Sequence, residues 1–298
     1  MEKKLIVRVA EGLGNQLFMY ANAYSIARDL GYDLLIDSKS GYFKKKNQKR
    51  KFELDKFNIN LSYADERFIY NSYIKDLKRK FLKNFNPFLK KKKYIIEYKD
   101  KSKHTKFMNY SNSNFDNVIY VEGHFESEKF FKKYSDDIKK QFTLNESSLS
   151  KENPYINKIS NSNSISICVR QNRFSEGENQ DFNKSEQLTK KTIDYIFRGI
   201  KYFENKVENP TFFIWSNSFV GLDKYFDKKK FIFVENSQNK SIYDFYLFKY
   251  CNHFIVGPTS FHWWGAWLNN NKNKICVRPK DINVSNNVDL WPENWISV

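Results

Sequence analysis

The chain has 298 residues, of which 40% are hydrophobic and 18% aromatic, enough for one large domain or two ordinary ones, and this excludes wholesale disorder. Its formal net charge of +17 suggests three kinds of partner: nucleic acid, an anionic membrane surface or a polyanionic substrate. The alternative is a lysine-rich surface that is simply solvated. Three cysteines without paired spacing argue against a disulfide framework or a zinc site, and no apolar run is long enough to cross a membrane, so we expect a soluble, cytoplasmic chain.

A strand–helix–strand pattern opens the chain. Residues 5–10 form an apolar run typical of a buried strand, and a Gly-rich turn follows at residues 11–14. Residues 15–30 have helical spacing up to Gly31, a residue type that commonly follows a helix end. Residues 33–37 then predict a second strand, which completes a βαβ unit of ordinary length.

The Gly-rich turn is a candidate ligand loop. A dinucleotide-binding turn has a third glycine where this chain has Leu17, so we disfavour NAD as a ligand. Gly14 allows a close backbone approach, and Asn15 and Gln16 offer amide groups to a ligand at the start of the helix. The alternative is an ordinary turn in which Asn15 caps the helix.

Residues 41–117 hold most of the positive charge, including the basic run Lys44–Lys51. Between residues 74 and 93 the apolar positions have helical spacing among lysines, and Pro87 should break the helix. One interpretation is a core-packing helix with a lysine-rich outer face, and the other is a helix that lies on a membrane surface. The apolar positions are Ile74, Leu77, Phe81, Phe85 and Phe88.

The rest of the chain predicts a second α/β half. A strand at 118–121 and a helix at 127–140 precede an Asn- and Ser-rich linker at 145–164, which puts a domain boundary near residue 150. Beyond the linker, short apolar strands alternate with helices, as in a parallel, doubly wound sheet. We expect strands at 164–170, 211–216, 230–234, 253–257 and 274–278, and helices at 185–203, 219–226, 241–250 and 261–269. The predicted fold class is therefore α/β, with Rossmann-like halves at 1–150 and 151–298.

Ligands of such sheets bind beyond the carboxyl ends of the strands, and two loops of the second half carry suitable residues. Arg170 follows a buried strand, where a guanidinium can bind a diphosphate with two parallel hydrogen bonds, although a surface salt bridge would also explain it. In residues 257–267, the Thr259 and Ser260 hydroxyls and the N–H groups of a helix start form a phosphate seat. The alternative for that segment is a core helix, and we expect its three tryptophans to pack inside.

Taken together, these motifs match the sequence pattern of a known family. In this order and spacing the chain resembles the bacterial α-1,2-fucosyltransferases, glycosyltransferase family 11, from about residue 5 to the C-terminus. The resemblance implies inverting, metal-independent transfer of L-fucose from GDP-fucose to a glycan hydroxyl, in a GT-B-type fold whose two Rossmann-like domains face each other across a cleft. The segments that carry it are Gly12-Leu13-Gly14-Asn15-Gln16-Leu17-Phe18, Gly123…Ser127…Phe130-Phe131, Trp215-Ser216-Asn217, Tyr243-Asp244-Phe245-Tyr246…Cys251-Asn252-His253, Ser260-Phe261-His262-Trp263-Trp264-Gly265-Ala266-Trp267-Leu268 and Pro292-Glu293-Asn294-Trp295.

The resemblance also suggests roles for the candidate residues. Arg170 would neutralise the diphosphate, while the Ser260 hydroxyl and the Phe261 N–H would hold a phosphate. Asp244 or Asn217 would contact guanine or ribose, and Ser216 beside Asn217 would also belong to the substrate site. Asn15, Gln16 and His124 would line the acceptor side.

One loop departs from the family. The family pattern His-x-Arg-Arg-x-Asp reads Cys168-Val169-Arg170-Gln171-Asn172-Arg173 here, so Arg170 alone carries over. This departure leaves open a different GDP-deoxysugar donor, such as GDP-colitose or a GDP-deoxyheptose.

The general base is not fixed by the pattern. Glu11 ends the first strand and could point its carboxylate into the cleft, unless it is simply a solvated turn residue. Asp181, in the stretch after Arg173, is the other candidate.

The remaining expectations concern partners. The basic segment at 74–93 would make the enzyme peripheral on the inner face of the cell membrane, where lipid-linked acceptors for surface polysaccharide or lipopolysaccharide are found. An RNA-binding protein is the distant alternative suggested by the charge. We expect no nucleic-acid partner, because the aromatic residues lie mainly on apolar strands and helix faces and not on a basic stacking platform.

Overall fold

The computed structural model describes residues 2–44, 50–110, 113–144, 153–175, 180–235 and 241–298. The chain divides into two units. Unit 1 is Met1–Leu144 with Ser285–Pro292, and unit 2 is Asn145–Val284 with Glu293–Val298. Residues 285–292 therefore group with the first unit, although a single division of the sequence near residue 150 places them in the second half.

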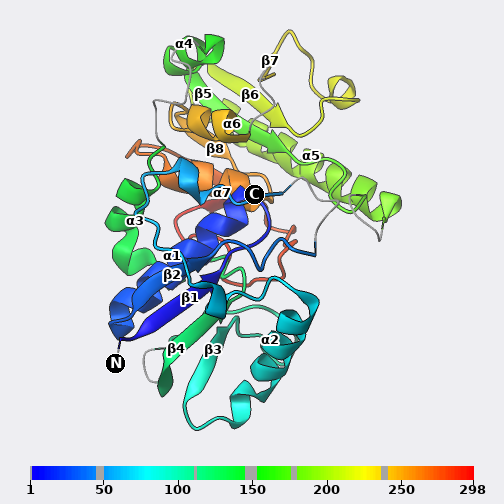
Figure 1. Cartoon of the computed structure of the whole chain (residues 1–298). Helices are drawn as coiled ribbons and strands as arrows, with labels where there is room; N and C mark the ends of the chain where they lie inside the picture. Colours follow the sequence, from blue (N-terminus) through cyan, green and yellow to red (C-terminus); the bar gives the residue numbers. More distant parts are fainter. Residues whose placement is uncertain (1, 45–49, 111–112, 145–152, 176–179, 236–240) are drawn as a thin grey trace. The chain divides into compact units, whose positions relative to one another are not determined.

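Unit 1 is built on a four-stranded parallel sheet in the order β2-β1-β4-β3 (Figure 1). The apolar residues of β1 are completely or almost completely buried, and α1 packs beside β1 and β2. The elements are β1 (Lys4–Arg8), α1 (Leu13–Leu30), β2 (Asp33–Asp37), α2 (Tyr73–Phe85), β3 (Lys92–Ile96), β4 (Phe115–Glu122) and α3 (Ser135–Gln141).

The predicted βαβ opening is confirmed, with adjusted bounds. Helix α1 ends before Gly31, which has the left-handed φ of 67° that a residue without Cβ adopts at little cost. It begins at Leu13 with Gly12 as N-cap, so the cap is not Asn15, as the alternative of an ordinary capped turn had it. The expected helix at 127–140 is broken into two 3₁₀ turns, Glu128–Phe130 and Lys132–Tyr134, before α3 begins. The cause is the buried Phe131 between them, whose φ of −137° is not helical.

The basic segment is partly as predicted. Helix α2 ends at Phe85, before Pro87, and a 3₁₀ turn at Asn86–Phe88 follows. Lys92 and Lys93 then start the parallel strand β3, because Tyr94 and Ile95 are buried against β4. Of the two interpretations of this helix, the one in which its apolar residues pack into the core is wrong, since Ile74 and Phe81 are 82% and 65% exposed. Residues 45–49 of the basic run lie outside the described residues.

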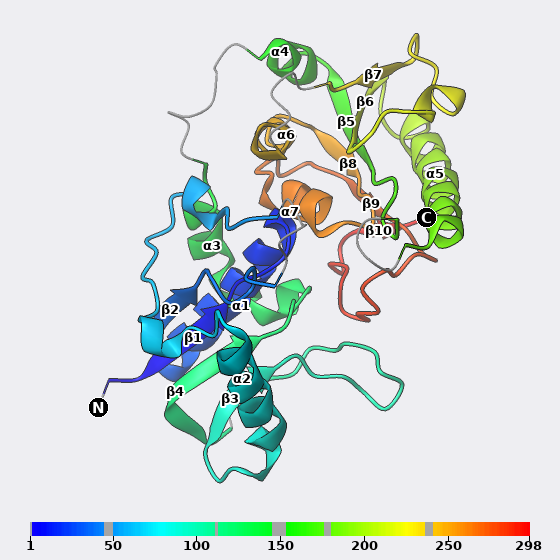
Figure 2. The ribbon, with the colours of Figure 1, turned by 45° about the vertical axis from the view of Figure 1, so that its right-hand side comes forward.

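Unit 2 is a six-stranded parallel sheet in the order β10-β9-β8-β5-β6-β7 (Figure 2). The alternation of strands and helices that the sequence predicts is confirmed. The elements are α4 (Pro154–Ser160), β5 (Asn163–Val169), α5 (Phe182–Glu204), β6 (Pro210–Ser216), β7 (Phe231–Phe233), α6 (Ser241–Phe248), β8 (His253–Ile255), α7 (Ser260–Leu268), β9 (Cys276–Arg278) and β10 (Ile296–Ser297).

Two expectations fail in unit 2. The stretch at 145–164 is not wholly a linker, because α4 begins at Pro154, with the Asn153 side chain accepting a hydrogen bond from the Tyr155 N–H. Residues 145–152 lie outside the described residues. The expected helix at 219–226 shrinks to a 3₁₀ turn at Leu222–Lys224, because Gly221 adopts a left-handed φ of 75° that ends any earlier helical turn.

Strand β5 separates two environments. Its branched residues Ile165, Ile167 and Val169 are fully buried in the cluster that includes Ile196 and Phe203 of α5. Small residues occupy the alternate positions and point to the opposite face, as the two-residue period of a strand requires. Among the described residues, no helix is long and apolar enough to cross a membrane.

Candidate active site

The strand orders place one topological switch point in each unit. In unit 2 the chain runs from β5 outward through β6 and β7, and then returns to β8 on the other side of β5. In unit 1 it runs from β1 to β2 and returns through β3 to β4, on the other side of β1. Ligands of open parallel sheets bind outside the carboxyl ends of the strands at such points. The loops after β5 and β8, and after β1 and β4, are therefore the places where topology alone predicts a site.

The loop after β8 is fixed by a buried histidine. His262 is fully buried, and its Nδ1 accepts a hydrogen bond from the Gly257 N–H at 3.0 Å, while its Nε2 lies 2.8 Å from Ser166 Oγ. Burial lowers the pKa of His262 to about 3, so the ring is neutral at physiological pH. Because Nδ1 is an acceptor, the proton belongs on Nε2, which donates to the β5 serine. The histidine therefore joins β5, the loop and α7.

The same loop leads into the start of α7. Thr259 is the N-cap, and its hydroxyl accepts a hydrogen bond from the His262 N–H at 3.2 Å. Ser260 and Phe261 are the first two residues of the helix, where backbone N–H groups have no partner within the helix. The three tryptophans predicted to pack inside do so: Trp263 and Trp264 are fully buried and Trp267 is 7% exposed.

Three of the predicted site residues affect the pKa of the Cys168 thiol, near the end of β5. Burial and, to a smaller extent, the negative charge of Asp244 raise the pKa of Cys168 to about 12. The positive charge of Arg170 and a hydrogen bond with Thr259 oppose this rise. The hydrogen bond places the Thr259 hydroxyl beside the sulfur, whereas the charges of Asp244 and Arg170 act on it through space. The structure therefore brings together residues from the β5 loop, from α6 and from the start of α7.

The close approach of β5 and β8 needs a glycine at the end of β8. A Cβ built on Gly257 would lie 2.4 Å from the Cys168 carbonyl oxygen, which no side chain tolerates without movement of the backbone. Gly257 also donates to His262, so the position fixes the loop twice.

The loop that contains Arg170 is tied to its neighbours on both sides. Asn217, just after β6, accepts a hydrogen bond from the Gln171 N–H at 2.8 Å and donates to the Gln171 carbonyl at 3.2 Å. Ser216 Oγ donates to the Val169 carbonyl at 2.9 Å. Arg173 donates to the Pro258 carbonyl at 3.0 Å, which connects the loop to the turn before α7. Ser216 and Asn217 thus hold the Arg170 backbone in place.

Asp181 lies at the start of α5. It is the N-cap of this helix, and its carboxylate accepts a hydrogen bond from the Lys184 N–H at 2.8 Å. The residue is exposed. Capping is thus a sufficient structural reason for an aspartate at this position.

In unit 1, Glu11 occupies the loop after β1. Its backbone has a φ of 66°, a conformation that is strained for a glutamate, and its carboxylate forms an ion pair with Arg50 at 2.7 Å. The Gln16 side chain holds this loop together. It is fully buried, and its amide donates to the carbonyls of Glu11 and Lys51 and accepts from the Glu53 N–H. The Gln16 amide is therefore part of the internal structure of the loop.

The other unit 1 residues predicted from the sequence are distributed over the same edge of the sheet. Gly14 is buried in the first turn of α1, and Asn15 beside it is partly exposed. His124 is exposed and follows β4, the neighbour of β1 in the sheet. Its neighbour Phe125 is buried, and the Phe125 N–H donates to the Glu97 carboxylate at 2.6 Å.

The sequence pattern assigns no role to Cys168, His262 or Gln171, although all three lie in the loops that form the site. The signal available for His262 was its position three residues after Thr259, inside a run of buried aromatics. No group of three or more His, Cys, Asp or Glu side chains that could hold a metal ion occurs within the part of the chain that the structure describes.

Comparisons with known proteins give a family match over almost the whole chain. The family model described as Glycosyl transferase family 11 matches residues 4–298. An alpha-1,2-colitosyltransferase from Escherichia coli is 27% identical, over 99% of this chain and 98% of its own length. The O-antigen biosynthesis glycosyltransferase WbnK from Escherichia coli is 28% identical, over 96% of this chain and 98% of its own length.

Solved structures share the fold. NodZ alpha-1,6-fucosyltransferase, in crystals soaked with GDP-fucose, is 16% identical with a TM-score of 0.53, and the match covers 90% of this chain and 93% of NodZ. A mutant of Arabidopsis thaliana FUT1 in complex with GDP is 11% identical with a TM-score of 0.50, over 94% of this chain and 71% of that one. These likenesses confirm the predicted fold class, which is that of the GT-B-type fucosyltransferases.

Proposed function

The chain belongs to glycosyl transferase family 11, and from this premise we propose that it transfers L-fucose from GDP-fucose to a glycan hydroxyl, with inversion at the anomeric carbon. It is a glycosyltransferase. The observation that carries the proposal for the donor is the position of Arg170 after β5 and of Thr259 at the start of α7, after β8, at the switch point of unit 2. The two strands approach so closely there that a Cβ on Gly257 would lie 2.4 Å from the Cys168 carbonyl oxygen, and the charge of Asp244 acts on the Cys168 thiol. A cation, a carboxylate and a helix N-terminus gathered at one switch point suit a nucleoside diphosphate.

In this proposal each group has one task at the donor. The Arg170 guanidinium neutralises the diphosphate and stabilises GDP as it leaves. The Thr259 and Ser260 hydroxyls and the Phe261 N–H hold a phosphate at the start of α7. The Asp244 carboxylate accepts hydrogen bonds from guanine or ribose. Ser216 and Asn217 position the Arg170 loop, which follows from their hydrogen bonds to Val169 and Gln171.

Inverting transfer also needs an acceptor side and a group that accepts the proton of the attacking hydroxyl. We assign the acceptor to the carboxyl edge of the unit 1 sheet, with Gly14, Asn15 and the exposed His124 as contacts and Gln16 as the support of the turn. Glu11 is the preferred base, because its ion pair with Arg50 holds the carboxylate in place, whereas the Asp181 carboxylate caps α5. Because the transition state has oxocarbenium character, a weak base such as a carboxylate suffices.

A second donor is favoured by specific observations. The loop at 168–173 departs from the family pattern, and one relative with nearly full coverage is named an alpha-1,2-colitosyltransferase. Colitose is the 3-deoxy counterpart of fucose, so the two donors differ in a single hydroxyl. A site that hydrogen-bonds this hydroxyl rejects the analogue by about 10⁴-fold or more, whereas a site that packs against a C–H group discriminates only by about 10²-fold. GDP-colitose and GDP-deoxyheptoses are therefore the alternatives to GDP-fucose.

The experiment compares kcat/KM for GDP-fucose, GDP-colitose and a GDP-deoxyheptose with galactoside acceptors, and identifies products by mass spectrometry. Arg170→Ala should lower kcat at least about 10²-fold with every accepted donor. Arg170→Lys should also be slow, because an ammonium cannot form two parallel bonds to a diphosphate. Wild-type turnover by Arg170→Ala would refute the leaving-group role, and transfer from none of the donors would refute the proposed reaction.

The proposal needs no metal ion, because the arginine and the helix N–H groups supply positive charge at the leaving group. We further propose that the enzyme works in the cytoplasm, as a peripheral protein on the inner face of the cell membrane, on a lipid-linked glycan acceptor. This is supported by the net charge of +17 and by residues 72–93, which contain eight lysines and one arginine against a single acid.

A further inference from the structure

Helix α2 is packed with its polar side inward. An amphipathic helix normally buries its apolar face. In α2 the buried residues are Asp76 and Arg79, which are 2% and 7% exposed. The apolar stripe of α2 and the following turn, which we define as Ile74, Leu77, Phe81, Phe85 and Phe88, is between 51% and 82% exposed. At about 100° per residue, this stripe lies on the side of the helix opposite Asp76 and Arg79.

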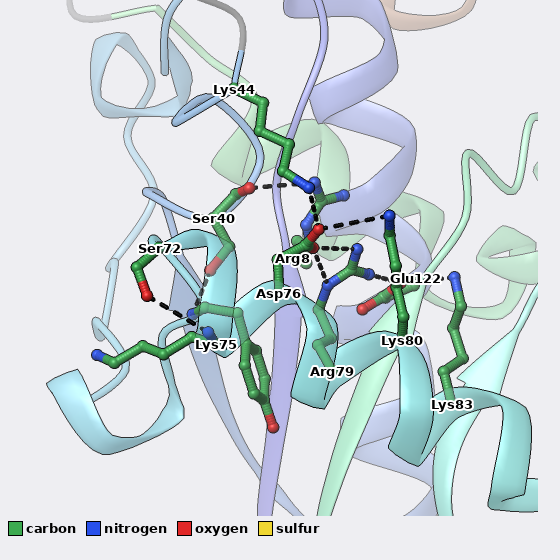
Figure 3. Close-up of polar contacts among 11 residues, drawn as sticks. Arg8, Ser40, Lys44, Ser72, Lys75, Asp76, Arg79, Lys80, Lys83 and Glu122 are labelled. Carbon is green, nitrogen blue, oxygen red and sulfur yellow. Dashed lines mark hydrogen bonds and ion pairs between the residues drawn. The ribbon is translucent and has the colours of Figure 1, made fainter.

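An ion network holds the polar side in place (Figure 3). The Arg79 guanidinium donates to Asp76 Oδ1 at 3.0 and 2.7 Å, and to Glu122 Oε2 at 2.5 Å. Lys83 approaches the same Glu122 oxygen at 3.2 Å, and Lys44 forms an ion pair with Asp76. Glu122 is the last residue of β4 and is 8% exposed, so the network joins α2 to the sheet of unit 1.

The end of the helix is anchored separately. The buried Asn86 side chain accepts hydrogen bonds from the N–H groups of Lys93 and Tyr94 at 2.7 and 3.0 Å, and donates to the Tyr94 carbonyl at 3.0 Å. The turn after α2 is therefore fixed to β3. With both contacts made by polar groups, the apolar stripe is directed outward in the folded protein, and no rearrangement is needed to present it.

The stripe is a continuous apolar ridge with lysines beside it. Phe81 and Phe85 stack with ring centroids 5.6 Å apart, and Phe85 and Phe88 lie 5.6 Å apart. From Ile74 to Phe85 the ridge is about 17 Å long, at about 1.5 Å per residue. Lys75 and Lys78 border it on one side and Lys80 on the other, and all three are exposed. Lys90 and Lys91 are exposed just beyond Phe88.

We propose that this face of α2 is the membrane-docking surface: the apolar stripe enters the interfacial layer of an anionic bilayer while the flanking lysines contact acidic headgroups. The inference rests on the proposed peripheral membrane association, to which it gives a location and a mechanism. An apolar helix face between cationic side chains is the pattern by which helices lie in the plane of an interface. Lysines can do both tasks, since the aliphatic stem lies along the apolar surface and the ammonium reaches the headgroups.

The charge around the stripe decides between a bilayer and a second copy of the chain. Two copies that met through this face would bring together two sets of exposed lysines on chains that each carry a net charge of +17. Like charges at an interface oppose association. An anionic bilayer instead offers the opposite charge at the lysines and an apolar layer at the stripe.

The test is flotation with vesicles of phosphatidylcholine alone and with 30% phosphatidylglycerol, at about 0.05 and 0.5 M salt. The wild-type protein should float with the anionic vesicles at low salt and dissociate at high salt. Leu77→Gln/Phe81→Gln should weaken this binding at least about tenfold, because binding scales with the apolar area inserted. Phe182→Gln is the matched control: Phe182 and Phe81 are both 65% exposed, and its replacement should leave vesicle binding unchanged.

Activity separates this inference from the proposed reaction. Because Leu77 and Phe81 are exposed, the double variant should keep its fold and transfer to a soluble acceptor within about twofold, but should transfer poorly to a vesicle-borne glycolipid. Equal vesicle binding by the wild type and the double variant would overturn the inference even if transfer is confirmed. If the wild type instead dimerises without binding vesicles, and the double variant does not dimerise, the stripe is an interface with a second copy. If no donor is used, the reaction is refuted, while the flotation result still tests the surface.

Discussion

The ion network beneath α2 allows a quantitative prediction for Arg79→Met. Methionine keeps much of the length and the helix propensity of arginine but removes its charge. The substitution deletes two hydrogen bonds to Asp76 and one to Glu122, and leaves both carboxylates buried. Removing one partner of a buried ion pair costs about 3–5 kcal/mol. We expect about 3 kcal/mol here, the lower end, because Lys44 still pairs with Asp76 and Lys83 with Glu122.

The measurement must report on unit 1. Five of the six tryptophans belong to unit 2, so intrinsic fluorescence would follow mainly that unit. Hydrogen exchange read by mass spectrometry on peptides from α2 and β4 is the direct assay. A loss of about 3 kcal/mol should speed exchange there by about 10²-fold, at 1.4 kcal/mol for each factor of ten.

A control is available on the same unit. Arg67 forms an ion pair with Asp65 at 3.1 Å, but both side chains are at least 60% exposed. Arg67→Met should therefore change stability by no more than about 0.5 kcal/mol. If Arg79→Met costs less than about 1 kcal/mol, or no more than Arg67→Met, the network does not hold the helix and the reasoning is wrong.

Four further predictions test other parts of the molecule. Burial would raise the pKa of Asp76, but Lys44 and Arg79 hold this pKa at about 2 against an ordinary 3.8, so the carboxylate stabilises the fold above about pH 4. As the pH falls from about 4 to 2, about 2 kcal/mol of unfolding free energy should be lost. Asp76→Asn should abolish this loss in acid unfolding curves. Gly257→Ala places a Cβ 2.4 Å from the Cys168 carbonyl oxygen, so we expect it to lower the free energy of unfolding by about 1–3 kcal/mol in thermal unfolding and to slow transfer. An unchanged stability and transfer rate would contradict the tight contact. Glu11→Gln should lower kcat at saturating donor at least about 10²-fold and Asp181→Asn less than about fivefold; the reverse order would move the base to Asp181. Transfer should survive EDTA, and full loss that Mn²⁺ restores would show that a metal replaces Arg170 in holding the diphosphate.

The sequence predicted the parts of the fold that depend on local pattern. The alternation of short apolar strands with helices predicted a parallel sheet in the second half, and Gly31 and Pro87 marked the ends of α1 and α2. Elements that depend on tertiary contact were missed. Strand β3 begins with two lysines and forms because Tyr94 and Ile95 are buried beside β4, and β10 consists of two exposed residues that pair with β9.

The candidate site was predictable where chemistry and topology coincide. Arg170 and Thr259 follow strands that the sequence identifies, and both lie at the switch point of unit 2. The internal roles of Gln16 and Asn217 were not predictable. Amides look alike in a sequence whether they bind a ligand or a nearby backbone, and their partners at Lys51 and Gln171 are set by the folded loops.

Helix α2 shows the limit of periodicity most clearly. Its sequence defines an apolar face and a polar face, but it does not say which one the protein buries, and burial of the apolar face is the usual outcome. Here the decision depends on Glu122, which is distant in the sequence and ends a strand of the sheet. A carboxylate at 8% exposure needs a cationic partner, and Arg79 reaches it only if the polar side of α2 faces the sheet. The same orientation of α2 therefore pairs the buried Glu122 carboxylate and exposes the apolar stripe. A protein that never met an apolar surface would gain nothing from exposing the stripe, so the inverted packing is itself an argument for the docking surface.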